Sequence, residues 1–159
     1  MREATHEDLR KRAVKWLTNT CRCGVVLSEM VSVAGETPDA IGWNGGRSIL
    51  VERKVSRADF HANKTKLFSR VGGGVGRQRY FLCPERLLTE ADVAGSDYGL
   101  LWDRGSHITK VVQAPPRESD LQNEVYMLTS ALRRVKVREF LIVVSESTLP
   151  IATQEQAGA

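Results

Sequence analysis

The segment that most constrains the fold is 38–54, which contains two strand-like stretches separated by an Asn-Gly-Gly sequence at 44–46. Asn-Gly and Gly-Gly both suit a two-residue type I′ turn, because each pair tolerates positive φ at both central positions. With Gly-Gly as the turn, Asp39 lies directly opposite Glu52, whereas with Asn-Gly the two acids are diagonal neighbours on one face. Lys54 projects from that same face. Both registers therefore predict two carboxylates and an amine in one small volume.

Apolar side chains occupy both faces of this predicted hairpin: Ile41, Trp43 and Leu50 on the face of the two acids, and Ala40, Ile49 and Val51 on the other. Charge in such surroundings is costly, and two adjacent carboxylates repel each other unless a cation joins them. Because hard oxygen ligands select Mg²⁺ or a similar ion, the pattern indicates a metal site. The alternative is a solvent-facing sheet with ordinary cross-strand ion pairs, which the apolar neighbours disfavour.

One motif resembles the signature of the PD-(D/E)XK nuclease superfamily: Pro38-Asp39, twelve intervening residues, and then Glu52-Arg53-Lys54. The residues that follow are similar to the MmcB-like DNA-repair branch of that superfamily, through 54–60, Lys64 and 80–84. The resemblance spans about half the chain. It implies an α/β domain with a restriction-endonuclease-like core, in which a helix, a three-stranded meander, a second helix and a further strand build a mixed sheet. A C-terminal helical extension would follow this core.

The resemblance also implies a chemistry for these residues. Asp39 and Glu52 would ligate Mg²⁺ together with the backbone carbonyl of Arg53, and Mn²⁺ would substitute for Mg²⁺. Lys54 would orient the attacking water and stabilise charge at the phosphorus. The expected function is a Mg²⁺-dependent DNA endonuclease or exonuclease in DNA repair, recombination or the processing of phage or host DNA. The alternative is a non-catalytic nucleic-acid-binding module that retains a nuclease-like fold.

Three further residues are candidates for the same site. The first predicted helix carries His6 and Glu7 near its start, where nucleases of this superfamily commonly place an acid. His6 falls on the inward stripe of that helix and Glu7 does not, although His6 also suits a capping turn in which backbone groups satisfy the ring. Glu29 interrupts the apolar row of the first predicted strand. It is either a third carboxylate of the site or an edge-strand charge that deters pairing with other chains.

Five cations are candidate phosphate contacts: Arg57, Lys64, Lys66, Arg77 and Arg79. The first three belong to a helix that a capping box at 56–59 is expected to open, and a solvated charged face is the alternative for them. The other two end a glycine-rich segment, 71–79, which lacks the Gly-Lys-Ser/Thr ending of a P-loop. We interpret that segment as a mobile lid or a DNA-contacting loop. As phosphate contacts, these cations would hold a DNA backbone in register.

The composition permits an anionic partner and shows no pattern of a membrane protein. The chain has 159 residues, a formal net charge of +4 and a pI near 9.1, which allows nucleic acid as a partner without requiring it. Cys21, Cys23 and Cys83 match no zinc pattern and indicate thiols in a reducing compartment. The N-terminus has no signal-peptide core, and no apolar run is long enough to span a bilayer. We therefore expect a cytoplasmic protein.

The predicted organisation is a nuclease-like core domain over 1–115 followed by a C-terminal helix and tail over 116–159. Within the core, the sequence predicts a first helix from about 5 to 18, with a capping box at its start and an apolar stripe of Leu9, Ala13, Trp16 and Leu17. Three further elements are predicted: a strand over 24–31, a short helix over 84–88, and a second hairpin over 98–112.

The C-terminal helix carries an apolar stripe that needs a partner. Ser119 is expected to cap this helix, and the stripe comprises Leu121, Val125, Leu128 and Leu132. The stripe either docks on the core or pairs with another copy in a homodimer. The apolar run 140–144 is a strand or a continuation of helix, which periodicity does not decide.

Overall fold

The computed structural model describes residues 5–31, 36–68 and 73–135. They form an α/β fold with one six-stranded mixed sheet whose strands lie side by side in chain order. The strands are β1 (Val25–Ser28), β2 (Ala40–Asn44), β3 (Arg47–Arg53), β4 (Gln78–Pro84), β5 (Tyr98–Asp103) and β6 (Ile108–Val112). The pairs β3–β4 and β4–β5 are parallel and the others antiparallel. The predicted α/β class with a mixed sheet is confirmed.

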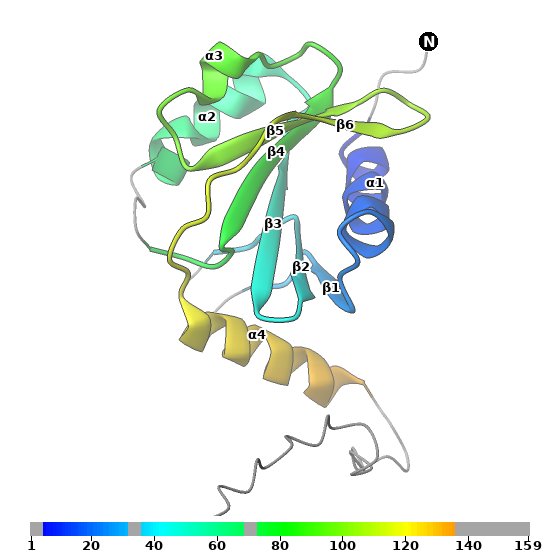
Figure 1. The fold of residues 1–159 in the computed structure, drawn as a ribbon, viewed down its shortest axis with the longest axis vertical. Helices are drawn as coiled ribbons and strands as arrows, with labels where there is room; N and C mark the ends of the chain where they lie inside the picture. Colours follow the sequence, from blue (N-terminus) through cyan, green and yellow to red (C-terminus); the bar gives the residue numbers. More distant parts are fainter. Residues whose placement is uncertain (1–4, 32–35, 69–72, 136–159) are drawn as a thin grey trace, which may run out of the picture.

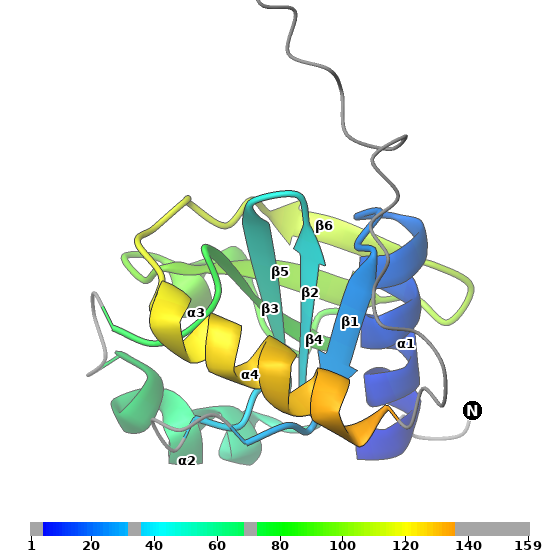
Figure 2. The ribbon, with the colours of Figure 1, turned by 90° about the horizontal axis from the view of Figure 1, so that it is seen from below.

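The helices are α1 (His6–Asn19), α2 (Arg57–Phe68), α3 (Glu90–Val93) and α4 (Leu121–Arg134). Parallel neighbours need crossover connections, and α2 and α3 provide them for β3–β4 and β4–β5. Figure 1 shows α1 on one side of the sheet and α2 and α3 on the other, and Figure 2 shows α4 running across the sheet near the β2–β3 hairpin. No helix in the described ranges is long and apolar enough to cross a membrane.

The side of the sheet covered by α1 will be called the α1 face. Its sheet residues are Ala40, Ile49, Val51, Tyr80, Leu82 and Leu101, and they pack against the four predicted core positions of the helix, Leu9, Ala13, Trp16 and Leu17, all of which are buried. The predicted capping box opens the helix: the Asp8 N–H donates to Thr5 Oγ1 (3.2 Å) and the Thr5 N–H donates to Asp8 Oδ2 (3.1 Å). The sequence pattern of α1 therefore predicted both its start and its buried side.

The opposite side, covered by α2, α3 and α4, will be called the α2 face. Its sheet residues are Ile41, Leu50, Phe81, Cys83, Tyr98 and Leu100. Aromatic rings connect the layers there: Phe60 of α2 meets Phe81 edge-on at 5.3 Å, and Phe81 stacks on Tyr98 with centroids 4.1 Å apart. Both faces of the hairpin strands are therefore covered, as the apolar neighbours of the two acids indicated.

The β2–β3 hairpin has the Gly-Gly turn of the two registers considered. Asn44 pairs with Arg47, and counting outward, Ala40 pairs with Val51. Gly45 has a φ of +57°, a conformation that an L side chain adopts with difficulty, whereas Gly46 has no positive φ. Positive φ at the first central residue alone is typical of a type II′ turn, so the predicted type I′ turn is wrong although the Gly-Gly register holds. One step beyond the last pair, this register places Asp39 opposite Glu52.

The C-terminal helix α4 docks through a side that its apolar stripe did not predict. Leu121, Val125 and Leu132 are 62%, 57% and 57% exposed, whereas Glu124 and Met127 are buried against the sheet. Leu128, the fourth residue of the predicted stripe, is half-buried. The helix therefore packs on the core, but not through the greater part of its stripe, and pairing of the stripe with another copy stays a prediction.

A buried carboxylate explains which side of α4 docks. Glu124 accepts hydrogen bonds from Trp43 Nε1 (2.9 Å), Ser48 Oγ (2.8 Å) and the Gly76 N–H (2.9 Å). These three hydrogen bonds stabilise the observed orientation of α4 more than burial of the apolar stripe would stabilise a helix rotated about its axis. The reason is that buried donors without an acceptor are costly.

Three element boundaries differ from the predictions. The segment predicted as a short helix, 84–88, is a turn in which the Leu87 N–H donates to the Pro84 carbonyl, and the helix begins only at Glu90, after the capping residue Thr89. The cap of α4 is Asp120, whose side chain accepts from the Asn123 N–H (3.0 Å), and not Ser119. β1 ends at Ser28 and not at 31. The predicted second hairpin is confirmed as β5–β6.

The contacts of Glu124 make α4 a testable part of the fold. Replacing Glu124 by Ala leaves three buried donors without an acceptor, so we expect the free energy of unfolding to fall by roughly 2–4 kcal/mol. Glu124→Gln keeps one acceptor oxygen and should cost less. The exposed Gln122 on the same helix is the control, and Gln122→Ala should stay within about 0.5 kcal/mol in urea denaturation. Equal effects of Glu124→Ala and Gln122→Ala would contradict this account of how α4 is held.

Candidate functional site

The predicted acid, acid and amine come together at the end of β3. Glu52 projects onto the α2 face beside Phe81 of β4, with which it is in register. The side chains of Asp39 and Glu52 share a hydrogen bond, and the charges of Asp39 and Lys54 both act on Glu52. Lys54 is only 3% exposed, and its ammonium nitrogen lies 5.9 Å from the centroid of the Phe81 ring. The structure thus brings the three principal site residues into one partly buried cluster. Its two acids, Asp39 and Glu52, will be called the carboxyl pair.

The electrostatics of this cluster are those of crowded like charges. Burial and then the adjacent charge of Asp39 raise the pKa of Glu52 to about 8, while Lys54 acts in the opposite direction. At neutral pH Glu52 therefore carries the proton that it shares with Asp39. Such a shift is typical of two carboxyl groups that cannot both ionise in a site with little water.

Asp39 is held in place by the residue next to Glu52. Its Oδ2 accepts from the Arg53 N–H (2.7 Å) and its Oδ1 from the Arg53 Nη2 (2.6 Å). The Arg53 guanidinium also donates to Glu29 Oε1 (3.2 Å) and to the His6 carbonyl (2.8 Å). One arginine therefore connects β3 to the ends of α1 and β1, and it orients Asp39 toward Glu52.

The three additional candidates have other roles in the structure. Glu29 follows β1 in a left-handed conformation, with a φ of 54°, and its carboxylate pairs with Arg53. His6 is exposed and reaches the cluster only through its backbone carbonyl, so the prediction that its ring faces inward is wrong. Glu7 pairs with Arg10 at 2.6 Å, and this pairing lowers the pKa of Glu7 to about 2. In the described ranges, none of the three adds a third side-chain oxygen to the carboxyl pair.

The donor set fits a hard cation in part. Two adjacent carboxyl groups are the oxygen ligands that Mg²⁺ prefers, and the raised pKa of Glu52 follows from its burial and from the charge of Asp39. Mg²⁺ commonly keeps several water ligands and needs only one or two carboxylates. Because the Arg53 guanidinium occupies Asp39 Oδ1, an ion would bind to Glu52 on the side where the two carboxyl groups meet.

A second charged group, which the sequence analysis missed, lies beside the carboxyl pair. Arg79 and Glu36 are 1% and 8% exposed and form an ion pair at 3.0 Å. Arg79 also donates to the Val75 carbonyl (2.7 Å) and to the Tyr98 hydroxyl (3.3 Å), and Glu36 accepts from the Val75 N–H (3.0 Å). The charge of Glu36 contributes to the raised pKa of Glu52. The sequence contained a signal for the burial of Arg79. Side chains alternate between the two faces of a strand, so Arg79 lies on the same covered face of β4 as Phe81.

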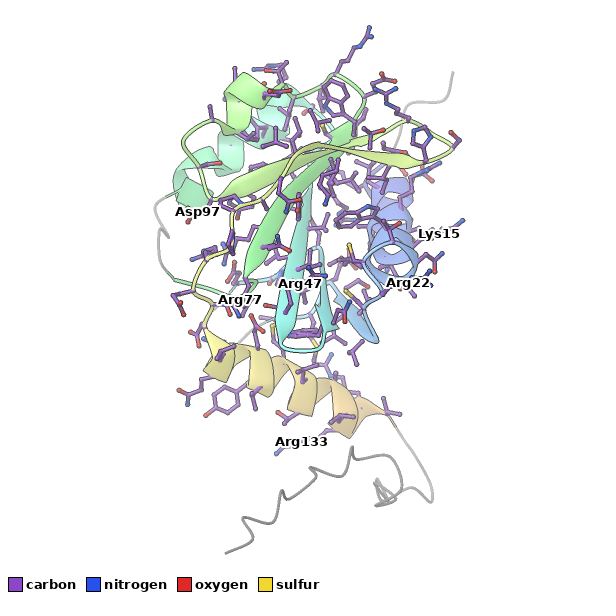
Figure 3. The ribbon with its side chains drawn as sticks, in the orientation of Figure 1. Lys15, Arg22, Arg47, Arg77, Asp97 and Arg133 are labelled. Carbon is purple, nitrogen blue, oxygen red and sulfur yellow. The ribbon has the colours of Figure 1, made fainter. Side chains whose placement is uncertain are left out.

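Buried Arg79 is therefore a structural residue, and its prediction as a DNA contact is wrong. Arg77 is exposed, as a phosphate contact must be, and Figure 3 shows it on the same side of the molecule as Asp97. Arg57 is exposed, but its guanidinium is bound by Asp92 at 2.7 Å. The side chains of Lys64 and Lys66 lie outside the described residues.

The glycine-rich segment is anchored where the structure describes it. Gly74 has a φ of +87°, and a Cβ there would overlap Arg79 Nη2 and the Glu36 carboxylate. The following Gly76 N–H donates to Glu124. The glycines thus let the chain approach buried charged groups closely. This packing requirement explains the glycines without a phosphate-binding loop. Residues 71–72 of the predicted lid lie outside the described ranges.

Comparison with known proteins supports the fold and leaves the activity open. The sequence matches no protein-family model, and it matches none of the curated proteins. The structure is similar to that of the SPO1766 protein of unknown function from Silicibacter pomeroyi, with a TM-score of 0.60 and 21% sequence identity. The similarity covers 84% of this chain and 89% of that chain. At this identity the likeness extends to the fold alone.

The raised pKa of Glu52 predicts how stability changes with pH. Between its ordinary pKa and about 8, the folded protein holds a proton that the unfolded chain releases, so this group's contribution to stability is complete at low pH and is lost as pH rises toward 8. Glu52→Gln imitates the protonated form. In EDTA we expect its Tm to exceed that of the native protein by a few degrees at pH 8, with a smaller difference at pH 5.

Two control variants make this measurement specific. Glu118→Gln removes an exposed acid and should change Tm little at either pH. Asp39→Asn removes the charged partner of Arg53 and should lower Tm throughout. A Tm difference between Glu52→Gln and the native protein that is the same at pH 5 and pH 8 would show that Glu52 is not protonated in the folded state.

Proposed function

We propose that this protein has a restriction-endonuclease-like core and hydrolyses phosphodiester bonds in DNA with the help of a divalent cation, preferably Mg²⁺. The observation that carries the proposal is the juxtaposition of Asp39, Glu52 and the buried Lys54 on one face of the sheet. The two fully buried acids described on that face, Glu36 and Glu124, have an arginine or three hydrogen-bond donors to neutralise them. Glu52 instead raises its pKa, as groups at functional sites often do.

In this proposal each residue of the cluster has a distinct role. Glu52 and Asp39 would hold the cation, and Arg53 would fix the orientation of Asp39 through its N–H and guanidinium. Lys54 is a buried point charge with a flexible stem, so its ammonium would orient a water molecule and stabilise negative charge that develops on the phosphate. The stacked rings of Phe81 and Tyr98 would exclude water from the inner side of the cluster. When bound, the cation would supply Lewis-acid stabilisation and a more acidic water.

DNA is the proposed substrate because the motif resembles that of DNA nucleases and because the chain is basic. The exposed Arg77 is the described cation that remains available among the predicted contacts. The alternative function is a non-catalytic nucleic-acid-binding module. The ion pair between Asp39 and Arg53 favours this alternative, because an Asp39 that serves only to pair with Arg53 would not hold a metal ion. Such a module would bind DNA with a salt dependence that Mg²⁺ does not change specifically, and it would show no turnover.

The decisive experiment is an assay of the pure protein on labelled duplex, single-stranded, flap and junction DNA with Mg²⁺, Mn²⁺ or EDTA. We expect cleavage of at least one of these DNAs with Mg²⁺ or Mn²⁺ and none with EDTA. Lys54→Met should keep the fold and lower the rate about 10²-fold or more, as for the loss of one transition-state contact. Lys11→Met, on an exposed lysine of α1, is the matched control and should leave the rate unchanged. Retained turnover in Lys54→Met would remove this lysine from the mechanism.

Metal binding can be tested without a substrate. A ligand that binds only the folded protein stabilises it, so Mn²⁺ at 100 times its Kd should add about 2.7 kcal/mol, or several degrees in Tm. Lys54→Met should keep this shift, and Glu52→Gln should lose most of it, at constant ionic strength. Equal Mn²⁺-induced shifts in Tm for Glu52→Gln and the native protein would place the ion elsewhere. The cluster would then be interpreted as a set of ordinary ion pairs.

A further inference from the structure

A pocket lies on the other side of the molecule from the carboxyl pair. It is formed between the C-terminal half of α1 and the turn that joins β5 to β6, and its volume is about 220 Å³. The carboxyl pair belongs to the α2 face of the sheet, whereas α1 covers the opposite face. The pocket is therefore separate from the proposed hydrolytic site, and its function does not depend on the carboxyl pair being catalytic.

The residues that line this pocket are suited to an anion. Arg12 and Lys15 project into it from successive turns of α1, and Ser106 and His107 face them from the β5–β6 turn. No acidic residue lines the pocket in the described part of the chain. Lys15 is exposed and forms no ion pair with any described residue. An anion in the pocket would thus meet positive charge on one side and small polar donors on the other.

Two fixed contacts hold these groups in position. Arg12 Nη1 is bound to Asp103 Oδ1 at 3.0 Å, and the Asp103 side chain is only 7% exposed, so the guanidinium is oriented while its other N–H groups remain as donors. His107 Nδ1 is 2.9 Å from Ser106 Oγ, which directs the imidazole. A preoriented guanidinium loses less entropy when it binds an oxyanion than a free side chain does.

The apolar wall and the size of the pocket restrict the ligand further. Trp16 and Ile108 form the wall, and Trp16 is fixed by an edge-to-face contact with Tyr80 at 5.5 Å. Pockets that enclose a complete drug-sized ligand usually have about 300–1,000 Å³. A smaller pocket with this lining fits one phosphate group and part of the molecule that carries it.

The surroundings extend the positive charge beyond the pocket. Arg22 follows α1, Arg47 lies at the tip of the β2–β3 hairpin, and both are exposed, as is Lys110 on β6. Figure 3 shows Lys15 and Arg22 on the side of the molecule away from Arg77 and Asp97. This charge would attract a polyanion to the α1 side without specifying its sequence.

We propose that this pocket binds a phosphate group, carried either by a small molecule such as a nucleoside monophosphate or by the end of a nucleic-acid strand. The phosphate lies against Arg12 and Lys15. The hydrogen-bonded Ser106 and His107 supply one further donor, either His107 Nε2–H or the Ser106 hydroxyl, because the bond between them uses the other proton. The macrodipole of α1 places partial negative charge at its C-terminus, so the anion stays away from Thr20, which also lines the pocket.

Isothermal titration calorimetry in EDTA tests this site without any contribution from metal-dependent cleavage. The ligands are inorganic phosphate, deoxythymidine 5′-monophosphate, and one single-stranded oligonucleotide prepared with and without a 5′-phosphate. Lys15→Glu should weaken binding at least tenfold, because a charge-assisted hydrogen bond is lost and a repulsion is gained. Lys11→Glu makes the same change of net charge one turn away, outside the pocket, and should weaken binding less than twofold. Thr20→Ala should also stay within about twofold.

The choice of ligands separates the two sources of the phosphate. Binding of the monophosphate with no preference for the phosphorylated oligonucleotide supports the pocket as a small-molecule site. Tighter binding of the phosphorylated oligonucleotide than of its unphosphorylated form, with loss of that preference in Lys15→Glu, supports a strand end. A shift of the Trp16 indole N–H signal in the NMR spectrum should accompany either result. No binding of any of the four ligands, or equal effects of Lys15→Glu and Lys11→Glu, would overturn the proposal.

Discussion

The register of the β2–β3 hairpin is the constraint on which the site depends. Gly45 adopts a φ of +57° at the turn, and pairing then proceeds outward one residue at a time to Ala40 and Val51. Side chains alternate along a strand, so a shift of one residue would move Glu52 to the α1 face and would bring Val51 to the position beside Phe81. The meeting of Asp39 with Glu52 is therefore a consequence of a turn at the far end of the hairpin.

The α2 face carries several charged groups, and they are neutralised in different ways. Glu124 has three donors, and Glu36 has Arg79. These groups hold α4 and the glycine-rich segment against the sheet, and replacing either partner would leave an uncompensated buried group. Glu52 is neutralised by a proton shared with Asp39. A proton is easily exchanged for another cation, whereas a guanidinium fixed by packing is not.

The same contacts explain why some sequence patterns were informative and others misleading. The stripe of α1 predicted its buried side because the side chains of the stripe pack against apolar side chains of the sheet. In α4 three of the four stripe residues, Leu121, Val125 and Leu132, are exposed because the hydrogen bonds of Glu124 decide the rotation of the helix. Arg79 was predicted as a surface cation because its partner, Glu36, is remote in the sequence and carries no motif.

The sequence by itself determined the hairpin and its charged end, the capping box of α1 and the α/β class, because these depend on turn residues and on periodicities that act over a few residues. The tertiary structure alone decided which cations neutralise which acids: Arg53 binds Asp39 and Glu29, and Arg79 binds Glu36. It also decided that Glu52 is left to take up a proton. Charge pairing in a buried layer follows from which groups lose water together, and that is known only when distant segments have packed against one another.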